Sequence, residues 1–348
     1  MEYRQLGRTG LRVSVIGLGT MTFGEQNTEA EGHEQLDCAL DHGVNLVDTA
    51  EMYSVPPRPE TYGSTERIIG TWLRKTGKRD KIILATKVAG PGAALGVAHV
   101  RGGNNTLDRK NIVAAVDASL ERLQTDYIDL YQLHWPSRQT NFFGKLGYQQ
   151  KAEDPGIPIE ETLDALDGLV RAGKVRHVGL SNETPWGLHR YLHLAETGGR
   201  VRVASIQNPY SLLNRSFEIG LAEMALREQV GLLAYSPLGF GVLSGKFLHG
   251  AMPPQSRIAR WQRFARYSTD QGSTAAAAYA EVARRHGLDM AKMALAFVRQ
   301  QRFTTSVLIG ATTMAQLQTN LGSIAVTLGP DVMQDLETVH RSQPNPCP

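Results

Sequence analysis

Three ionisable side chains of different kinds stand at the ends of three successive apolar runs. Asp48 ends a Leu-Val run, Lys87 ends the run Ile-Ile-Leu-Ala-Thr, and His134 follows Leu-Tyr-Gln-Leu. A fourth residue, Tyr53, lies shortly after Asp48 in the chain. Charged groups beside a buried strand are costly unless they are paired, so this set predicts a cluster with a function.

The chemistry that these four residues permit is proton transfer to a carbonyl oxygen. A free phenol has a pKa of about 10 and is a poor acid at neutral pH. An ammonium group nearby favours the phenolate, so we expect Lys87 to lower the pKa of Tyr53. Asp48 can hold Lys87 by an ion pair, and His134 can orient the carbonyl oxygen or donate to it. Together they predict a proton donor tuned toward the operating pH.

Two other interpretations of these residues are weaker. Strands often end in polar residues because turns begin there, which explains one or two such positions but poorly explains three ionisable ones in succession. A metal ion held by Asp48 and His134 would be repelled by Lys87, and no third ligand is evident in the sequence. We therefore expect no metal site.

The elements that must position these residues follow a regular rhythm of short apolar runs and longer helical patterns, which predicts βα units around a parallel sheet. Eight runs have strand character: residues 13–19, 45–50, 81–87, 128–134, 175–181, 203–207, 231–235 and 306–310. The prediction is an α/β fold, a (β/α)8 TIM barrel in which the strand ends meet at one rim. We expect an N-terminal β-hairpin at residues 3–11, extra C-terminal helices, and a single domain over residues 1–348.

Three long connections follow predicted strands, at residues 89–107, 136–158 and 238–267. Long connections in compact domains are usually functional or disordered, and in a barrel these would surround the mouth. The connection at 136–158 carries Phe142, Phe143 and Tyr148, whose rings could stack on an apolar or aromatic carbonyl compound.

The composition points away from several classes of protein. The formal net charge is +3 and charged residues make up 20% of the chain, which does not favour nucleic-acid or membrane partners. Two cysteines form no disulfide framework and no metal cluster. No signal-sequence core and no apolar run of about 18 residues is present, so we expect a cytoplasmic protein. Its oligomeric state is not readable from the sequence.

A series of motifs, taken in order along nearly the whole chain, resembles the aldo-keto reductase superfamily. The motifs are IGLGT at 16–20, NLVDTAEMY at 45–53, Lys87, His134, GLSN at 179–182, QNPY at 207–210, YSPL at 235–238, and IGAT at 309–312 with Gln316 and Asn320. Within the superfamily the chain most resembles the bacterial Tas-like group, through MYSVPPRPET at 52–61 and NFFGKLGY at 141–148.

The resemblance implies an NADP(H)-dependent oxidoreductase, acting on the CH-OH group of donors, that reduces a small aldehyde or ketone. Tyr53 would be the general acid, and Asp48, Lys87 and His134 would complete a catalytic tetrad. NADPH or NADP+ would lie along the barrel rim and contact, in chain order, Gly19, Thr20, Met21, Asp48, Ser181, Asn182, Gln207, Ala234, Tyr235, Ser236, Pro237, Leu238, Gly239, Phe240, Gly241, Val242, Leu243, Ser244, Lys246, Arg257, Gly310, Thr312, Gln316 and Asn320.

The rim must hold such a cofactor because the dinucleotide fingerprint of doubly wound folds is absent: the first glycines are spaced GxGxxxxG. Lys246 and Arg257 suit the 2′-phosphate that distinguishes NADPH from NADH, since Arg offers a bidentate fork and Lys a point charge. Either could instead be a solvated surface charge. Where many relatives carry Glu before the last Asn of the adenosine motif, this chain has Thr319, which leaves that contact open.

Two alternatives to a reductase also stand. One is a cofactor-binding regulatory protein on the same fold, like the potassium-channel beta subunits, although those relatives have Asn where this chain has His134. The other is a barrel enzyme of different chemistry, such as a lyase or isomerase, which would not need the cofactor segments. The physiological substrate is not readable from the sequence.

Overall fold

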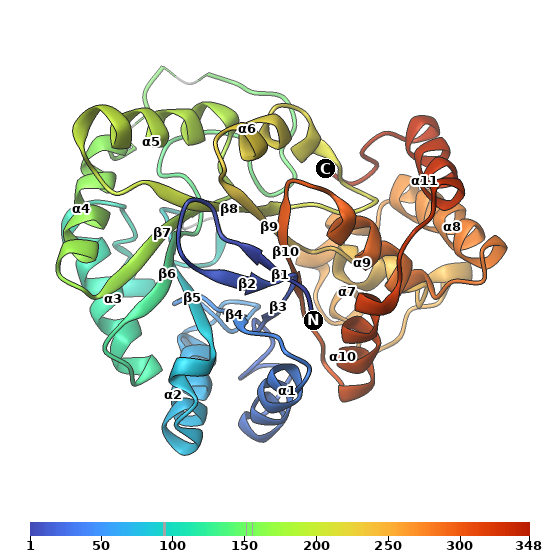
Figure 1. Ribbon diagram of the computed structural model, residues 1–348, viewed down its shortest axis with the longest axis horizontal. Helices are drawn as coiled ribbons and strands as arrows, with labels where there is room; N and C mark the ends of the chain where they lie inside the picture. The colour runs from blue at the N-terminus through green and yellow to red at the C-terminus, as the bar shows by residue number, and fades with distance from the viewer. Residues whose placement is uncertain (93–94, 151, 155) are drawn as a thin grey trace.

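Eight parallel strands close into a barrel in the order β10-β3-β4-β5-β6-β7-β8-β9. The computed structural model describes residues 1–92, 95–150, 152–154 and 156–348. The predicted (β/α)8 barrel is confirmed, and Figure 1 shows helices packed around it. The strands are β3 Ile16–Gly19, β4 Leu46–Asp48, β5 Ile83–Val88, β6 Ile128–Leu133, β7 Val175–Ser181, β8 Val203–Pro209, β9 Gly231–Tyr235 and β10 Thr304–Ile309.

Several of the helices begin at a side-chain cap. Thr28 and Glu31 form a reciprocal capping box at the start of the first helix, and Asp108 accepts a hydrogen bond from the Asn111 backbone at the start of α3. The α-helices are α1 Glu29–Asp41, α2 Ser64–Thr76, α3 Arg109–Leu123, α4 Ile159–Arg171, α5 Pro185–Gly198, α6 Leu221–Arg227, α7 Arg257–Arg260, α8 Asp270–Arg285, α9 Met290–Gln300, α10 Met314–Leu321 and α11 Pro330–Ser342. Within the described ranges, none of them is long and apolar enough to cross a bilayer.

The predicted start of the first barrel strand, at residue 13, is wrong. Residues 12–14 belong to the hairpin, in which β1 Tyr3–Gln5 pairs with β2 Arg12–Ser14, and the barrel strand begins only at Ile16. The Ser14 hydroxyl donates to the Ile16 carbonyl at 2.7 Å and the Val15 N–H donates to the Glu2 carbonyl at 3.0 Å, so the chain turns a corner there. Continuous β-favouring residues hid this corner from the sequence pattern.

The barrel interior is apolar at its lower end. Inward-facing Leu46, Ile83, Leu130, Leu233 and Leu308 form one buried cluster. The hairpin lies across this end in Figure 1 and closes it with Leu6 and Val13, both of them fully buried. Because side chains alternate along a strand, the residues two positions further on along β4 and β6 also face inward, at the upper end.

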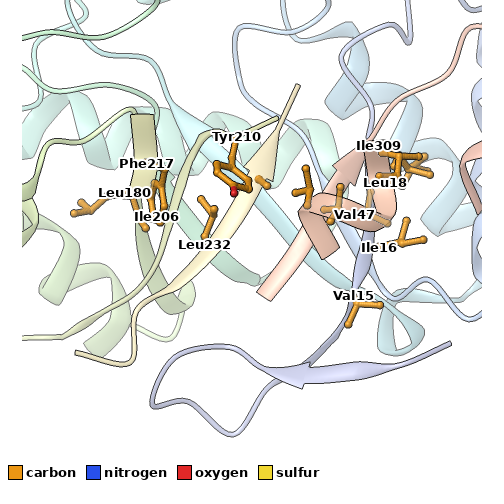
Figure 2. Packing of buried hydrophobic residues seen from close by; sticks show 14 of the residues in the cluster. Val15, Ile16, Leu18, Val47, Leu180, Ile206, Tyr210, Phe217, Leu232 and Ile309 are labelled. Carbon is orange, nitrogen blue, oxygen red and sulfur yellow. The ribbon is translucent and has the colours of Figure 1, made fainter. Parts of the chain in front are cut away.

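A second, larger core fills the layer between barrel and helices. Figure 2 shows Val47, Leu180, Ile206 and Leu232 in this cluster. Each of the first three precedes a predicted site residue by one position, so alternation sends the apolar side chain outward and the polar one into the barrel. The outer core therefore fixes the direction in which the site residues point.

The three long connections lie where they were expected, after β5, β6 and β9. Two of them touch, since Arg263 donates to the Leu95 carbonyl at 3.2 Å. Residues 93 and 94 in the first connection and 151 and 155 in the second are outside the described part of the chain. The connection after β6 folds back toward the barrel, with the Phe143 ring 5.8 Å from the Trp135 ring.

Candidate active site

Asp48 and Lys87 form a buried ion pair at the upper end of the barrel. Asp48 is the last residue of β4 and Lys87 lies near the end of β5, and these strands are neighbours. The Lys87 Nζ lies 2.6 Å from the Asp48 Oδ2 and 2.8 Å from the Thr49 carbonyl oxygen. Lys87 is 0% exposed, so its charge depends on these two acceptors.

Tyr53 and His134 complete the predicted cluster. The Lys87 Nζ is 5.1 Å from the centroid of the Tyr53 ring, and the Tyr53 and His134 rings meet edge to face at 5.6 Å between centroids. Backbone hydrogen bonds hold this arrangement, because the His134 N–H donates to the Val88 carbonyl and the Glu51 N–H to the Lys87 carbonyl. The structure thus brings together all four residues that the sequence predicted to act together.

The electrostatics of the phenol differ from the expectation. Burial, reinforced by the Asp48 carboxylate, raises the pKa of Tyr53 well above its ordinary value, and Arg257 opposes this only in part. The prediction that Lys87 lowers the pKa of Tyr53 is therefore wrong for this structure. The reason is that burial of the phenol, together with the negative charge of Asp48, outweighs the nearby positive charges, so the phenol keeps its proton.

His134 is held neutral. Burial, together with the positive charge of Lys87, lowers the pKa of His134 well below its ordinary value. Its Nδ1 atom is buried and has no hydrogen-bond partner among the described residues. A neutral imidazole carries one N–H donor, which suits a carbonyl oxygen placed beside the Tyr53 hydroxyl.

One residue of this cluster was missed by the sequence analysis. Gln132, on β6, donates from Nε2 to the Asp48 Oδ1 at 3.1 Å and is 0% exposed. The alternation of the strand gave a usable signal, because Leu130, Gln132 and His134 are spaced two apart and therefore share the inward face.

The residues predicted to hold a nicotinamide ring form a connected rim. Asn182 donates to the His134 carbonyl at 2.8 Å and accepts from the Tyr235 hydroxyl at 2.6 Å. Ser181 donates to the Gln207 carbonyl at 2.8 Å, and Gln207 donates to the Asp48 Oδ1 at 2.8 Å. The predicted ring-holding residues and the predicted catalytic residues therefore belong to one hydrogen-bonded network.

The segment after β9 winds into a tight turn at the rim. Residues Gly239–Ser244 form a 3-10 helix broken by left-handed backbone at Phe240 (φ 54°) and Gly241 (φ 95°). A Cβ atom on Gly241 would lie 2.7 Å from the Lys246 Nζ, so glycine is needed for Lys246 to lie across it. Val242 and Leu243 are buried in the outer core, so their side chains pack and only their backbone is available to a ligand.

Lys246 and Arg257 are two cations that form no ion pair within the described part of the chain. Among the described residues, no carboxylate shifts the pKa of either cation, and the Arg257 Nε is buried without an acceptor. Burial lowers the pKa of Arg257 to about 10, and burial with repulsion from Arg257 lowers the pKa of Lys246. The Arg257 guanidinium carbon lies 5.3 Å from the Phe240 ring and 5.5 Å from the Phe264 ring. Two such cations side by side provide a site for an anion.

The predicted adenosine end extends from the loop before α10 to the last turn of that helix. Gln316 accepts from the Thr312 backbone at 3.0 Å, and Asn320 donates to the Gly310 carbonyl at 3.2 Å. The Thr319 hydroxyl donates to the Ala315 carbonyl of its own helix at 2.9 Å. The residue that departs from the family pattern thus turns its hydroxyl to the helix backbone.

The predicted cofactor-binding segment Gly19–Met21, at the end of β3, lies between the nicotinamide end and the adenosine end of the rim. The Thr20 hydroxyl donates to the Asp48 carbonyl at 2.8 Å, and the Met21 carbonyl accepts from the Val55 N–H at 3.0 Å. Gly19 lies against β10, where an added Cβ would come within 3.2 Å of the Ile309 carbonyl. This segment therefore lies between the Asp48 cluster and the α10 end.

Comparison with known proteins identifies relatives over the full chain. The profile of the Aldo/keto reductase family matches residues 15–341. The chain is 56% identical to "Protein tas" of Escherichia coli over 348 residues, which covers 100% of both chains.

More distant relatives carry two different kinds of name. "Uncharacterized oxidoreductase YrpG" of Bacillus subtilis is 33% identical, over 97% of this chain and 96% of its own. "Probable voltage-gated potassium channel subunit beta" of Arabidopsis thaliana is 30% identical, over 99% of this chain and 98% of its own. Oxidoreductase and channel-subunit names thus both occur among the full-length relatives.

Proposed function

The chain belongs to the aldo/keto reductase family, a family of oxidoreductases, and from that premise we propose that it is an NADPH-dependent reductase of aldehydes or ketones. The observation that carries the proposal is the cluster at the upper end of the barrel. There the Lys87–Asp48 pair lies beneath the Tyr53 ring, and the neutral His134 imidazole lies beside it. These are the groups needed to place a carbonyl oxygen and protonate it.

The preference for NADPH rests on the two unpaired cations. A half-buried guanidinium whose Nε has no acceptor among the described residues is costly, and a phosphate group would supply both the charge and the acceptors that Arg257 and Lys246 lack. NADPH carries a 2′-phosphate that NADH lacks. The residues present therefore fit the phosphorylated dinucleotide, with Lys246 and Arg257 holding phosphate and Gln207, Asn182, Ser181 and Tyr235 holding the nicotinamide end.

When bound, NADPH supplies the hydride that adds to the carbonyl carbon. The roles of the protein side chains follow from their surroundings. His134 orients the carbonyl oxygen by an N–H donor, and Tyr53 donates its proton as negative charge develops on that oxygen. The raised pKa of Tyr53 keeps the phenol protonated until then, and Lys87, held by Asp48, stabilises the phenolate that results.

The substrate is proposed to be a small carbonyl compound with an apolar or aromatic group. The His134 ring lies 4.9 Å from the Trp135 ring, which in turn contacts Phe143. The Trp135 indole N–H is already used, because it donates to the Pro91 carbonyl at 2.9 Å. This leaves aromatic faces and edges, rather than polar groups, beside the oxygen-binding end.

The proposal is tested by following NADPH oxidation at about 340 nm with purified protein and a panel of aldehydes and ketones. We expect turnover with at least some aromatic or apolar aldehydes, and no turnover without a carbonyl substrate. The Tyr53→Phe variant, which keeps the ring, serves as the matched control for contaminating reductases. A protein that binds NADPH but reduces no member of the panel would favour the regulatory alternative, which no observation in the structure supports at present.

A further inference from the structure

Gln132 is a buried polar residue whose presence in the barrel interior is not explained by the proposed roles of the four catalytic residues. It lies on β6 with β7 between it and Gln207 on β8, while Asp48 comes from β4. The interior layers of such a barrel are built from alternate strands, and these layers are normally apolar. Here one layer is polar, and Gln132, Gln207 and Asp48 are at most 3% exposed.

The hydrogen bonds of this layer can be followed atom by atom. Gln132 donates from Nε2 to the Asp48 Oδ1 at 3.1 Å. Gln207 uses both hydrogens of its Nε2, one to the Asp48 Oδ1 at 2.8 Å and one to the Gln132 Oε1 at 3.1 Å. The other carboxylate oxygen of Asp48 accepts from Lys87 at 2.6 Å.

This pattern allows only one orientation of the two amides. An ionised carboxylate can only accept hydrogen bonds, so both glutamines must turn a nitrogen toward Asp48. The Gln132 oxygen then meets the second Nε2 hydrogen of Gln207. If the Gln207 amide were reversed, its oxygen would face two other oxygens in a buried site, which is strongly unfavourable.

The one amide atom left over is the Gln207 Oε1. It accepts no hydrogen bond from the described part of the chain, whereas the Gln207 nitrogen is saturated. Gln207 also lies in the rim segment next to Ser181 and Asn182, since its carbonyl accepts from the Ser181 hydroxyl and the Asn182 N–H. A group that pairs with Oε1 must therefore present a hydrogen-bond donor, such as an N–H.

We propose that Gln132 is a positioning residue that joins the Asp48 carboxylate to the Gln207 amide and so holds the Gln207 oxygen ready for the carboxamide NH2 of nicotinamide. The proposal rests on the proposed function, because it takes the nicotinamide end of the cofactor to lie at Gln207. It links the residues that handle the proton to those that orient the hydride donor. Gln132 itself touches neither substrate nor cofactor.

The first test compares two cofactors that differ only in the group that faces Gln207. The reduced 3-acetylpyridine analogue of NADPH has a methyl ketone in place of the carboxamide and therefore has no N–H donor. We expect the parent to bind NADPH about tenfold more tightly than the analogue, as for loss of one buried hydrogen bond. In Gln132→Met one Nε2 hydrogen of Gln207 loses its acceptor, so the side chain leaves its place and the preference should fall below about threefold.

The second test uses Gln132→Glu, which has nearly the same shape. A protonated Glu can still donate to Asp48 and accept from Gln207, but an ionised one places a second negative charge against Asp48. We expect the preference for the carboxamide to survive at low pH. We also expect kcat to fall as the pH rises through the pKa of the new carboxyl group, a dependence that the parent lacks. A residue that only packs would not introduce this ionisation.

Gln35→Met is the matched control, because Gln35 is also a buried glutamine, 1% exposed, but lies on α1 in the helix layer and not in the Asp48–Gln132–Gln207 layer of the barrel interior. It should retain the parental cofactor preference. If Gln132→Met retains the tenfold preference while the parent binds NADPH and reduces aldehydes, the positioning role is overturned and the proposed function stands. If the parent itself binds neither cofactor, the proposed function fails, and the positioning role fails with it.

Discussion

The two ends of the barrel interior are built from the same strands and yet have opposite character. At the lower end Leu46 and Leu130 join the apolar cluster that the hairpin closes. Two residues further along the same strands, Asp48 and Gln132 stand in a buried polar layer. Alternation along the strands turns both sets of side chains inward, so it does not explain why one end is apolar and the other polar. The two ends differ in whether they leave polar atoms without hydrogen-bond partners.

The apolar cluster at the lower end consists of hydrocarbon side chains that pack against each other and carry no polar atoms to satisfy. At the upper end most polar atoms find partners within the chain, and a few do not. The His134 Nδ1 and the Arg257 Nε are buried without partners among the described residues, and no carboxylate there shifts the pKa of Lys246. A ligand or substrate can offset the cost of such unpaired ionisable groups, so we expect these atoms at the upper end to contact one.

The largest expected effect lies at the upper end, in Tyr53→Phe. The variant loses the proposed proton donor but keeps the ring that contacts His134. General acid catalysis is worth about 10²–10⁴-fold, so we expect kcat to fall at least about a hundredfold with NADPH affinity unchanged. Steady-state rates and a fluorescence titration of NADPH measure the two quantities. A variant within a few-fold of the parental rate would show that the proton comes from elsewhere, with His134 as the next candidate.

The second prediction concerns the lower end, in Leu6→Ala. Leu6 is 0% exposed and belongs to the hairpin that closes the barrel. Removing a buried leucine costs about 2–5 kcal/mol, so the free energy of unfolding in urea should fall by that amount while kcat and KM at 25 °C stay near the parental values. We propose that residues 1–348 form one domain, so the loss should appear in a single transition.

Leu11→Ala is the matched control for this prediction, because Leu11 lies in the same hairpin and is only partly buried against the cluster. It should cost clearly less stability than Leu6→Ala. A large loss of kcat in Leu6→Ala, measured where the variant is fully folded, would contradict the separation of the two ends.

The third prediction tests the unpaired cations through Lys246→Met. A charge-assisted contact to phosphate contributes about 1.5–3 kcal/mol, so the preference for NADPH over NADH should fall about ten- to hundredfold. The ratio of the two dissociation constants is the measurement. Lys110→Met on α3, where the lysine is exposed, is the control for loss of one positive charge. An unchanged ratio in Lys246→Met would mean that Lys246 does not hold the 2′-phosphate.

The sequence predicted the eight-stranded barrel and the meeting of Asp48, Lys87 and His134, because apolar runs that end in polar residues encode both periodicity and direction. It did not predict the corner at Val15, since β-favouring residues continue through it. The raised pKa of Tyr53 was also beyond reach, because it depends on how deeply the phenol is buried and on the Asp48 charge nearby. Gln132 was missed because an amide carries no charge that singles it out.

The smallest expected effect compares a histidine at each end through the pH dependence of stability. Burial lowers the pKa of His134 well below its ordinary value, and it also lowers the pKa of His177, which lies lower on β7 opposite Leu130. Above a pH of about 6.5 both imidazoles are neutral in the folded and unfolded chain and cost nothing. Below it the unfolded chain binds protons that the folded chain excludes, so the free energy of unfolding falls, by at most about 1.4 kcal/mol per pH unit for each histidine.

His134→Asn should therefore flatten the loss of stability between pH 6.5 and 5.5 more than His177→Asn does, because Lys87 adds to burial at His134, whereas the Asp129 carboxylate opposes burial at His177. Urea unfolding at pH 7.5, 6.5 and 5.5 measures the slopes for the parent and both variants. Equal slopes in the parent and His134→Asn would show that the folded chain protonates His134 as readily as the unfolded chain does. The imidazole would then carry a charge at acid pH, and its role as a neutral donor to the carbonyl oxygen would be limited to higher pH.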